Sequence, residues 1–445
     1  MHHTITIHGH TYTVDPVTGD NWPAGEEPPA GRNGAFAKRG RIHRRGGLVG
    51  RVPYTYVGLH TSVHCNLACR YCQVAGYRRG ADPAIMDDQA RSRALRWAVL
   101  EFGAGARRVV LAYDLSGEPL LSWERFLDLA DEAKGLAVEA GKPVTWGLNT
   151  NGMGLTDGII EELERRPEIN LAVSIDGPAE AQDAMRRTAG GRGTYGRAAD
   201  AARRALDSPA AHLKQTHAVA TLTGAYPHPD LVLEHLVELG FERISISPVR
   251  GAGDGWGIDA ESLPLLYKGY TRLADRLADD LLHGDGHLYD SLLPTDGFKT
   301  VLARVAGLVR SPFPCPAAGT QCAIGPDGTI YACDATVGWP QARIGTIDEG
   351  LDEERRARIA QRLVDHHPHC RSCWARKLCG GECAHVALLS AGDIAAVDQA
   401  RCELRRHVTC EAIHFYHVVR SARPELVARM IESLGRAVTS EGTVQ

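Results

Sequence analysis

Between residues 53 and 250, short apolar runs alternate with longer segments in which apolar residues recur at helical spacing. Strand and helix in alternation indicate an α/β fold with a parallel sheet and right-handed crossovers. Six strands in this length fit a partial (β/α)6 TIM-like barrel better than the closed eight-stranded barrel. The predicted strands are 54–60, 108–113, 143–149, 170–176, 214–222 and 242–247, and the predicted helices are 87–103, 122–140, 155–165, 194–206 and 228–239.

Polar motifs follow four of these strands, at the carboxyl ends where parallel α/β sheets gather their chemistry. A cysteine triplet at 65–72 follows the first strand, and SGEP at 116–119 follows the second. TNG at 150–152 follows the third, and SIDGP at 174–178 ends the fourth. We therefore expect one site that is assembled from these four segments.

The remaining chain divides by pattern into further units. Residues 1–52 form an N-terminal extension, in which 4–14 alternates as a strand does. Residues 251–310 begin with a glycine-rich loop and continue as a helical linker. Residues 311–410 are rich in cysteine, and 411–445 form a C-terminal helical segment whose amphipathic pattern spans 408–436.

The extension carries a basic segment, whose cations are Arg32, Lys38, Arg39, Arg41, Arg44 and Arg45. One interpretation is a surface that binds an acidic peptide, and the other is a solvated arm.

Composition narrows the class of partner. A net charge of −4 argues against nucleic acid or an anionic membrane as the main partner. No apolar run has the length of about 18 residues that a membrane span needs, and the N-terminus does not have the pattern of a secretory signal. We expect a cytoplasmic protein. In that reducing setting, the 12 cysteines predict metal ligands rather than disulfides.

The triplet is Cys65, Cys69 and Cys72. Ordinary iron–sulfur clusters and structural zinc sites take four protein ligands. Three thiolates would leave one iron of a [4Fe–4S] cube open, and a metal with an open position can bind and activate a small molecule. The alternatives are a zinc site completed by His60 or His64, or thiols without metal.

With the aromatic Tyr71 before its last cysteine, the triplet resembles the cluster motif of radical S-adenosylmethionine (SAM) enzymes, and the resemblance extends over about residues 54–410. It implies that SAM binds the open iron and that the reduced cluster cleaves it to a 5′-deoxyadenosyl radical. The radical then takes hydrogen from an unactivated C–H bond. The cofactor supplies this chemistry, and the protein orients it and excludes water.

The same resemblance assigns cofactor contacts. SGEP is similar to the family's GGEP segment, with Ser116 in place of the first glycine. Arg186, twelve residues after Ser174, matches an arginine that meets the cofactor carboxylate in sulfatase-maturating relatives, a role that suits a guanidinium. Each of these residues could instead serve a turn or a cap. The implied cofactor-binding residues are Tyr71, Gly117, Glu118, Pro119, Asn151, Ser174 and Arg186.

The second cysteine region resembles the SPASM domain, which extends radical enzymes that mostly modify peptides and proteins. Its G-x4-C mark is Gly328 with Cys333. The resemblance implies two auxiliary [4Fe–4S] clusters, both closed by four thiolates and so suited to electron transfer; two zinc sites are the alternative. The implied ligand sets are Cys315, Cys322, Cys333 and Cys383 for one cluster, and Cys370, Cys373, Cys379 and Cys402 for the other. Cys410 is left over and is expected to be buried packing.

Asp334 directly follows Cys333. In sulfatase-maturating relatives an aspartate at this place is the proposed general base, and a partly desolvated carboxylate near a cluster suits that role. The alternative is a turn aspartate after a strand.

The combined expectation is a three-cluster radical SAM enzyme that modifies a peptide or protein side chain. We rank an oxidative cross-link in a ribosomally made peptide natural product first. The enzyme alternatives are formylglycine generation in a sulfatase and dehydrogenation of a small carbohydrate or aminocyclitol; a non-catalytic metal scaffold is the alternative from another class. Expected partners are a substrate with a leader peptide and a flavodoxin or ferredoxin as electron donor.

Overall fold

The computed structural model describes residues 2–28, 52–73, 85–115, 117–251, 253, 255–309, 315–360 and 362–439, with side chains to 434. The basic segment at 32–45 and Ser116 lie outside the described residues.

All six predicted strands of the central sheet are confirmed. They are parallel and lie side by side in chain order, with each strand paired to the next. Every residue of the first two is buried, as expected of parallel strands that are covered on both faces. The strands are β4 (Thr55–Leu59), β5 (Val109–Tyr113), β6 (Val144–Thr150), β7 (Ile169–Ser174), β8 (His217–Leu222) and β9 (Ile244–Pro248).

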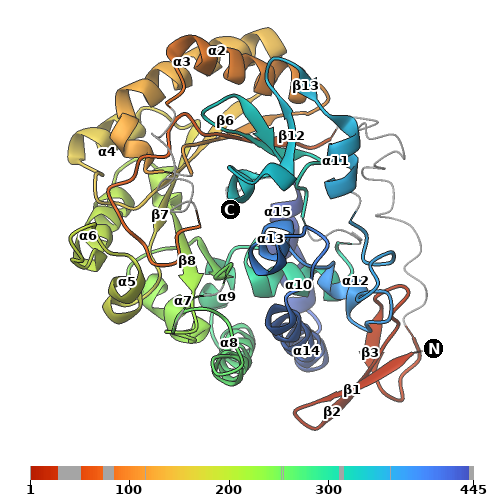
Figure 1. The fold of residues 1–445 in the computed structure, drawn as a ribbon. Coiled ribbons are helices and arrows are strands. Elements are labelled where there is room, and N and C mark those ends of the chain that lie inside the picture. Colours follow the sequence, from red (N-terminus) through yellow and green to blue (C-terminus); the bar gives the residue numbers. More distant parts are fainter. Residues whose placement is uncertain are drawn as a thin grey trace.

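The helices between these strands lie along the outer side of the curved sheet (Figure 1). Their ends follow local chemistry: the carboxylate of Asp87 caps α2, the hydroxyl of Thr156 caps α4, and Gly141, at φ 60°, ends α3. The five predicted helices are present and a short α5 is added. Their bounds are α2 (Asp88–Arg96, continued by a π-helix at Trp97–Phe102), α3 (Trp123–Ala140), α4 (Asp157–Glu164), α5 (Ala179–Met185), α6 (Tyr195–Leu206) and α7 (Pro229–Glu238).

The sheet has two distinct faces because side chains alternate along a strand. Val57 of β4 and Leu111 of β5 pack with Phe126 of α3 on what we call the helix-covered face. Tyr56 and Ala112, one position away on the same strands, form a separate small cluster on the opposite face.

The cysteine-rich region extends this same sheet. Strand β10 (Gln321–Ile324) pairs in parallel with β4, and β11 (Thr329–Tyr331), β12 (Arg343–Thr346) and β13 (Gly350–Leu351) follow as antiparallel neighbours. In the described residues the sheet has ten strands in the order β13-β12-β11-β10-β4-β5-β6-β7-β8-β9. It therefore ends at β13 and β9, which is the arrangement of an open sheet.

The remaining helices pack beside the open part of the sheet (Figure 1). The expected helix at 408–436 is two helices, because Pro424 disfavours the helical conformation at Arg423, which has φ −140° and ψ 76°. None of the helices in the described part of the chain is both long and apolar enough to cross a bilayer. The helices are α8 (Leu263–His283), α9 (His287–Ser291), α10 (Gly297–Val305), α11 (Glu353–Ala360), α12 (Arg376–Cys379), α13 (Ala384–Ala391), α14 (Gln399–Ala422) and α15 (Leu426–Thr439).

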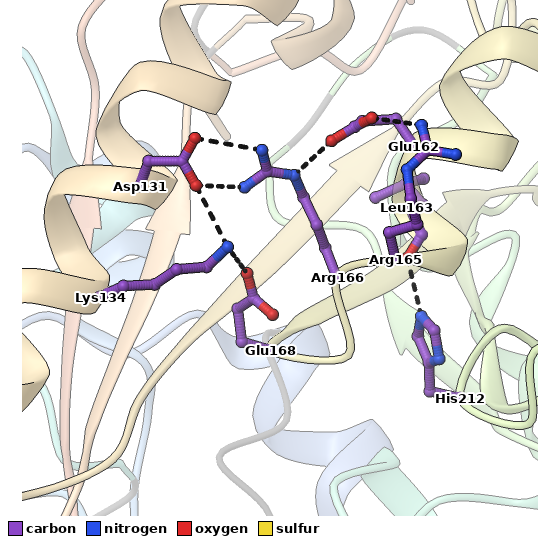
Figure 2. A network of polar contacts seen from close by, with 8 residues as sticks. All are labelled: Asp131, Lys134, Glu162, Leu163, Arg165, Arg166, Glu168 and His212. Atoms are coloured by element: carbon purple, nitrogen blue, oxygen red, sulfur yellow. Dashed lines mark hydrogen bonds and ion pairs between the residues drawn. The ribbon is translucent and has the colours of Figure 1, made fainter.

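An ion-pair network holds α3 and α4 together at the end of the sheet where β7 begins (Figure 2). The guanidinium of Arg166 donates to both carboxylate oxygens of Asp131, at 2.7 and 3.2 Å, and to Glu162 at 2.7 Å. Lys134 lies 3.1 Å from both Asp131 and Glu168. The hydrogen bond from Arg166 lowers the pKa of Asp131 to about 2. Because this end is opposite the carboxyl ends of the strands, the network is structural.

The N-terminal extension begins with a three-stranded antiparallel sheet, β1 (His3–Ile7), β2 (His10–Val14) and β3 (Asn21–Pro23). The alternating pattern at 4–14 is thus two strands, joined at His8 and Gly9, which both have positive φ. The small sheet packs on α14, where His417 donates to the Asn21 side-chain oxygen at 2.8 Å and Tyr12 bonds His414 at 2.8 Å.

We expect the contact between this small sheet and α14 to weaken as the pH falls. Burial, with Arg420 and His414 nearby, lowers the pKa of His417 to about 4. The pKa of an unfolded histidine is near 6.5, so between pH 6.5 and pH 4 only the unfolded segment takes up the proton. The contribution of His417 to the stability of the contact is therefore fully present above pH 6.5. It is lost as the pH falls below 6.5, by up to about 1.4 kcal/mol per pH unit.

Hydrogen exchange of residues 2–24 measures this effect. Between pH 7 and pH 5, protection should fall more steeply in wild type than in H417Q, in which glutamine can donate to Asn21 but does not titrate. Equal slopes in the two proteins would contradict the assignment to His417.

Candidate functional site

The cysteine triplet lies in the segment that follows β4. The backbone N–H groups of Ala68 and Arg70 donate to the carbonyls of Arg187 and Met185, at 2.7 and 2.9 Å, so the segment is anchored to the end of α5. Burial, with smaller contributions from the nearby thiols of Cys72 and Cys65, raises the pKa of Cys69 to about 11, against the opposing charge of Arg186. The structure therefore gathers the three predicted ligands.

The segment after β5 packs directly against the triplet segment. A Cβ on Gly117 would lie 2.5 Å from the carbonyl oxygen of His64, so only glycine fits. Glu118 is 3 % exposed, and its carboxylate accepts from the Thr150 hydroxyl at 2.5 Å and from the Asn151 N–H at 2.8 Å. This carboxylate thus positions the end of β6, and Pro119 follows it as a buried residue that opens a 3-10 turn.

The TNG segment contacts the triplet segment through a residue that the sequence analysis did not name. Asn151 donates its side-chain N–H to the side-chain oxygen of Asn66 at 2.7 Å and lies 3.9 Å from the sulfur of Cys65. In the sequence, the position of Asn66 directly after Cys65 could have identified it as a residue of the site. Ser174, at the end of β7, donates to Asn149 of β6 at 3.0 Å.

Tyr71, Arg186 and Asp176 form a buried polar group beside the triplet. The Tyr71 hydroxyl donates to Asp176 at 2.6 Å and accepts from Arg186 at 2.7 Å, and Arg186 lies 3.9 Å from Asp176. Burial raises the pKa of Asp176, and the charge of Arg186 lowers it. The Nε of Arg186 is buried and makes no hydrogen bond within the described part of the chain, so the guanidinium keeps an N–H group that could donate to a carboxylate ligand.

Asp334 lies against the opposite face of β4. Its carboxylate is 2.9 Å from Nε2 of His60, which is fully buried, and 3.5 Å from the side-chain nitrogen of Gln321. A Cβ on Gly58 would lie 1.6 Å from the same carboxylate, so this glycine creates the space that Asp334 occupies. His60, considered above only as a zinc ligand, is therefore the partner of the predicted base.

Three of the four cysteines assigned to the first auxiliary cluster are mutual neighbours. Burial, together with the nearby thiols of Cys383 and Cys315, raises the pKa of Cys333 to about 12. Cys315 is exposed as a residue, yet desolvation of its sulfur and the nearby Cys383 raise its pKa as well. The structure does not bring Cys322 to these three, because strand alternation in β10 places it on the helix-covered face beside Val57.

The four cysteines assigned to the second auxiliary cluster are brought together. Burial, together with the neighbouring thiols of Cys379, Cys402 and Cys373, raises the pKa of Cys370 to about 11. Cys402 is presented by the first turn of α14, and its sulfur lies 3.6 Å from Nε2 of His369. This set spans the segment 370–379 and α14, which are adjacent in the fold.

Within the described residues, no group of three or more His, Cys, Asp or Glu side chains encloses a single metal ion. A cube of four irons binds each thiolate at a different iron, so its ligands stand farther apart than those of one ion.

A link joins the two cysteine regions. The side chain of Gln73, the residue after the triplet, donates to the backbone carbonyl of Arg250 at 2.6 Å. Burial has the larger effect on the pKa values of Cys315, Cys333 and His385, and the positive charge of Arg250 lowers all three. Arg250 thus lies between the triplet segment and the first auxiliary set.

A family model described as "Radical SAM superfamily" matches residues 59–224, which include the triplet and the polar group around Arg186. Among curated proteins, the serine-type anaerobic sulfatase-maturating enzyme of Klebsiella aerogenes is 24% identical over 338 residues, which are 72% of this chain and 78% of the relative. The enzyme of the same name from Klebsiella pneumoniae is also 24% identical.

Solved structures of the same fold accompany these relatives. The structure of anSMEcpe with bound AdoMet has a TM-score of 0.69 and 20% identity, and the match covers 86% of this chain and 98% of that chain. Streptococcus suis SuiB bound to precursor peptide SuiA has a TM-score of 0.51 and 16% identity, with coverage of 79% and 76%. The shared fold includes the sheet whose carboxyl edge carries the site described above.

Proposed function

Because residues 59–224 form a domain of the Radical SAM superfamily, we propose that the chain is a SAM-dependent enzyme that modifies a side chain of a peptide or protein. An oxidative cross-link in a ribosomally made peptide is the first product that we propose. The observation that carries the proposal is the triplet beside a buried arginine that keeps an unused donor. The similarity to sulfatase-maturating enzymes and the fold shared with SuiB support a peptide or protein substrate.

The residues of the first site have separate roles in this proposal. A reduced [4Fe–4S] cluster with SAM supplies, when bound, a carbon radical that removes hydrogen from the substrate. Cys65, Cys69 and Cys72 hold the cluster, and Arg186 orients the SAM carboxylate through its unused Nε donor. Glu118 fixes the TNG segment, as its hydrogen bonds to Thr150 and Asn151 show.

Asp334 and His60 form the second part of the proposal. Their contact of 2.9 Å lies at the carboxyl end of β4. The carboxylate of Asp334 accepts the proton that the substrate loses, and the imidazole of His60 shares that proton. Two auxiliary clusters held by the C-terminal cysteines would provide an acceptor for the second electron, and a flavodoxin or ferredoxin would be the donor of the first. Cys370, Cys373, Cys379 and Cys402 hold one auxiliary cluster; the ligands of the other are considered below.

Formylglycine generation is the second candidate function. It is favoured by Asp334, which the structure places next to His60 beside the cysteine set of the first auxiliary cluster, and by the 24% identity to a serine-type maturating enzyme. Both candidates remove two hydrogen atoms in total from the substrate, so the mass change alone does not separate them when serine is the target.

The test uses protein reconstituted without oxygen, with dithionite, SAM and two peptides. One peptide carries a sulfatase-type serine motif, and the other is the translated product of a short reading frame beside the gene. We expect 5′-deoxyadenosine and the loss of two hydrogens from the second peptide, with no aldehyde trapped by a hydrazine. Aldehyde on the first peptide would establish the second candidate instead.

The wild-type reaction without peptide gives the background. No 5′-deoxyadenosine above the level of C69A would contradict both candidates. D334N should still cleave SAM but should form less product, because it removes the proton acceptor and leaves the first site intact.

A further inference from the structure

Cys322 lies on the wrong face of the sheet to join the other cysteines of the first auxiliary set. Strand β10 pairs with β4 so that Cys322 stands opposite Val57 and Ile324 opposite Leu59. All four residues are fully buried and belong to the hydrophobic cluster of the helix-covered face. A thiol in such a place behaves as a small hydrophobic side chain.

The charges around Cys322 support this placement. Burial raises its pKa well above the usual value, and the other groups that act on it are Arg356 and Asp334. Cys315, Cys333 and Cys383 act on one another. Arg356, in turn, is engaged with the carbonyls of Ala318 and Gly319, both at 2.8 Å.

The set is therefore one protein ligand short of four. An unsatisfied donor or acceptor beside it identifies the missing ligand. His385 lies two residues after Cys383, in the first turn of α13, and is fully buried. Neither of its ring nitrogens makes a hydrogen bond to any residue that the structure describes. Burying an imidazole without a hydrogen-bond partner is unfavourable, so such a group in a folded protein calls for a partner.

Among the described residues, the ring in contact with His385 is Trp339, in a T-shaped arrangement with the ring centroids 6.2 Å apart. The other polar neighbour is the cation of Arg250, which also lies near Cys315 and Cys333. Imidazole nitrogen is a known ligand of iron in iron–sulfur clusters.

We propose that three cysteines, Cys315, Cys333 and Cys383, hold the first auxiliary cluster together with His385, and that Cys322 is a core residue. This inference rests on the proposed function, since it assumes that the chain binds clusters. It replaces the set of four thiolates with three thiolates and one imidazole. A neutral ligand in place of a thiolate makes the cluster less negative, which raises its reduction potential.

Iron and sulfide content test the role of Cys322. In protein reconstituted without oxygen, C322A should keep the iron content of wild type, whereas C315A should lose about four irons per chain. C322V, which keeps the core filled, guards against a folding defect. A loss of about four irons in both Cys322 variants would overturn the inference. If wild type itself binds no iron, the proposed function fails.

Pulsed electron paramagnetic resonance tests His385. The protein carries the triple change C65A/C69A/C72A, so that only auxiliary clusters contribute, and its histidines are labelled with 15N. We expect a strong 15N coupling that disappears in H385Q. H369Q is the matched control, because His369 lies near the second auxiliary set, and it should leave the strong coupling in place. The absence of strong coupling before any change, or its survival in H385Q, would overturn the assignment.

Discussion

Replacing Cys69 with alanine should abolish the cleavage of SAM. Its thiol lies in the anchored segment after β4 with Cys65 and Cys72 as neighbours, and a cube that keeps only two thiolates loses the attachment that leaves one iron open to SAM. We expect 5′-deoxyadenosine to fall to background and iron to fall by about four atoms per chain. Both are measured on protein reconstituted without oxygen.

C410A is the matched control for this change. Cys410 lies on α14 against the hydrophobic core, and burial raises its pKa to about 11, as expected of a packing cysteine. The same alteration of one thiol there should leave iron content and SAM cleavage as in wild type. If C69A cleaved SAM at the same rate as C410A, the proposed function would be contradicted.

Replacing Arg186 with methionine should strongly destabilise the polar group that it forms with Tyr71 and Asp176. Asp176 is 3% exposed, and without Arg186 its carboxylate would be left buried and unpaired. Breaking a buried ion pair in this way costs about 3–5 kcal/mol. The pKa of Asp176 should rise further, because burial already raises it and the opposing charge is gone.

Two measurements separate the structural and cofactor roles of Arg186. Hydrogen exchange of the segment around residue 71 reports the loss of the polar group, and equilibrium binding of SAM reports the loss of the carboxylate contact. R186K keeps a cation and should recover the protection but not the affinity, since one ammonium does not replace the guanidinium fork. R187M, at an exposed arginine next in the chain, should change neither; an equal effect of R187M would contradict the account.

The parallel strands were predictable because a strand that is buried on both faces is apolar along its whole length, and each of them is such a short apolar run. The addition of β10 to β4 was not. Nothing in the run Gln321–Ile324 distinguishes a strand of the central sheet from a strand of a separate domain, and the pairing joins residues that are far apart in the chain. The break at Pro424 could have been foreseen from proline chemistry, and the periodic pattern on both sides obscured it.

The cysteine spacing identified where the donors lie along the chain but not which face of a strand each one occupies. Cys322 shows the limit: its spacing resembles that of a ligand, and its pairing with Val57 places it in the core. The contact of His60 with Asp334 was equally hidden, because it depends on the absence of a side chain at Gly58. The spacing of residues along the chain carries no information about such contacts between β-strands.

The pairing of β4 with β10 has a consequence for chimeras and truncations. The two strands are hydrogen-bonded to each other, although a domain boundary at about residue 311 would assign them to different domains. A fragment that stops before β10 would present the bare edge of β4 to solvent, and an unprotected edge of this kind templates aggregation. Swapping the cysteine-rich module among relatives therefore has to carry β4 and β10 over as a matched pair.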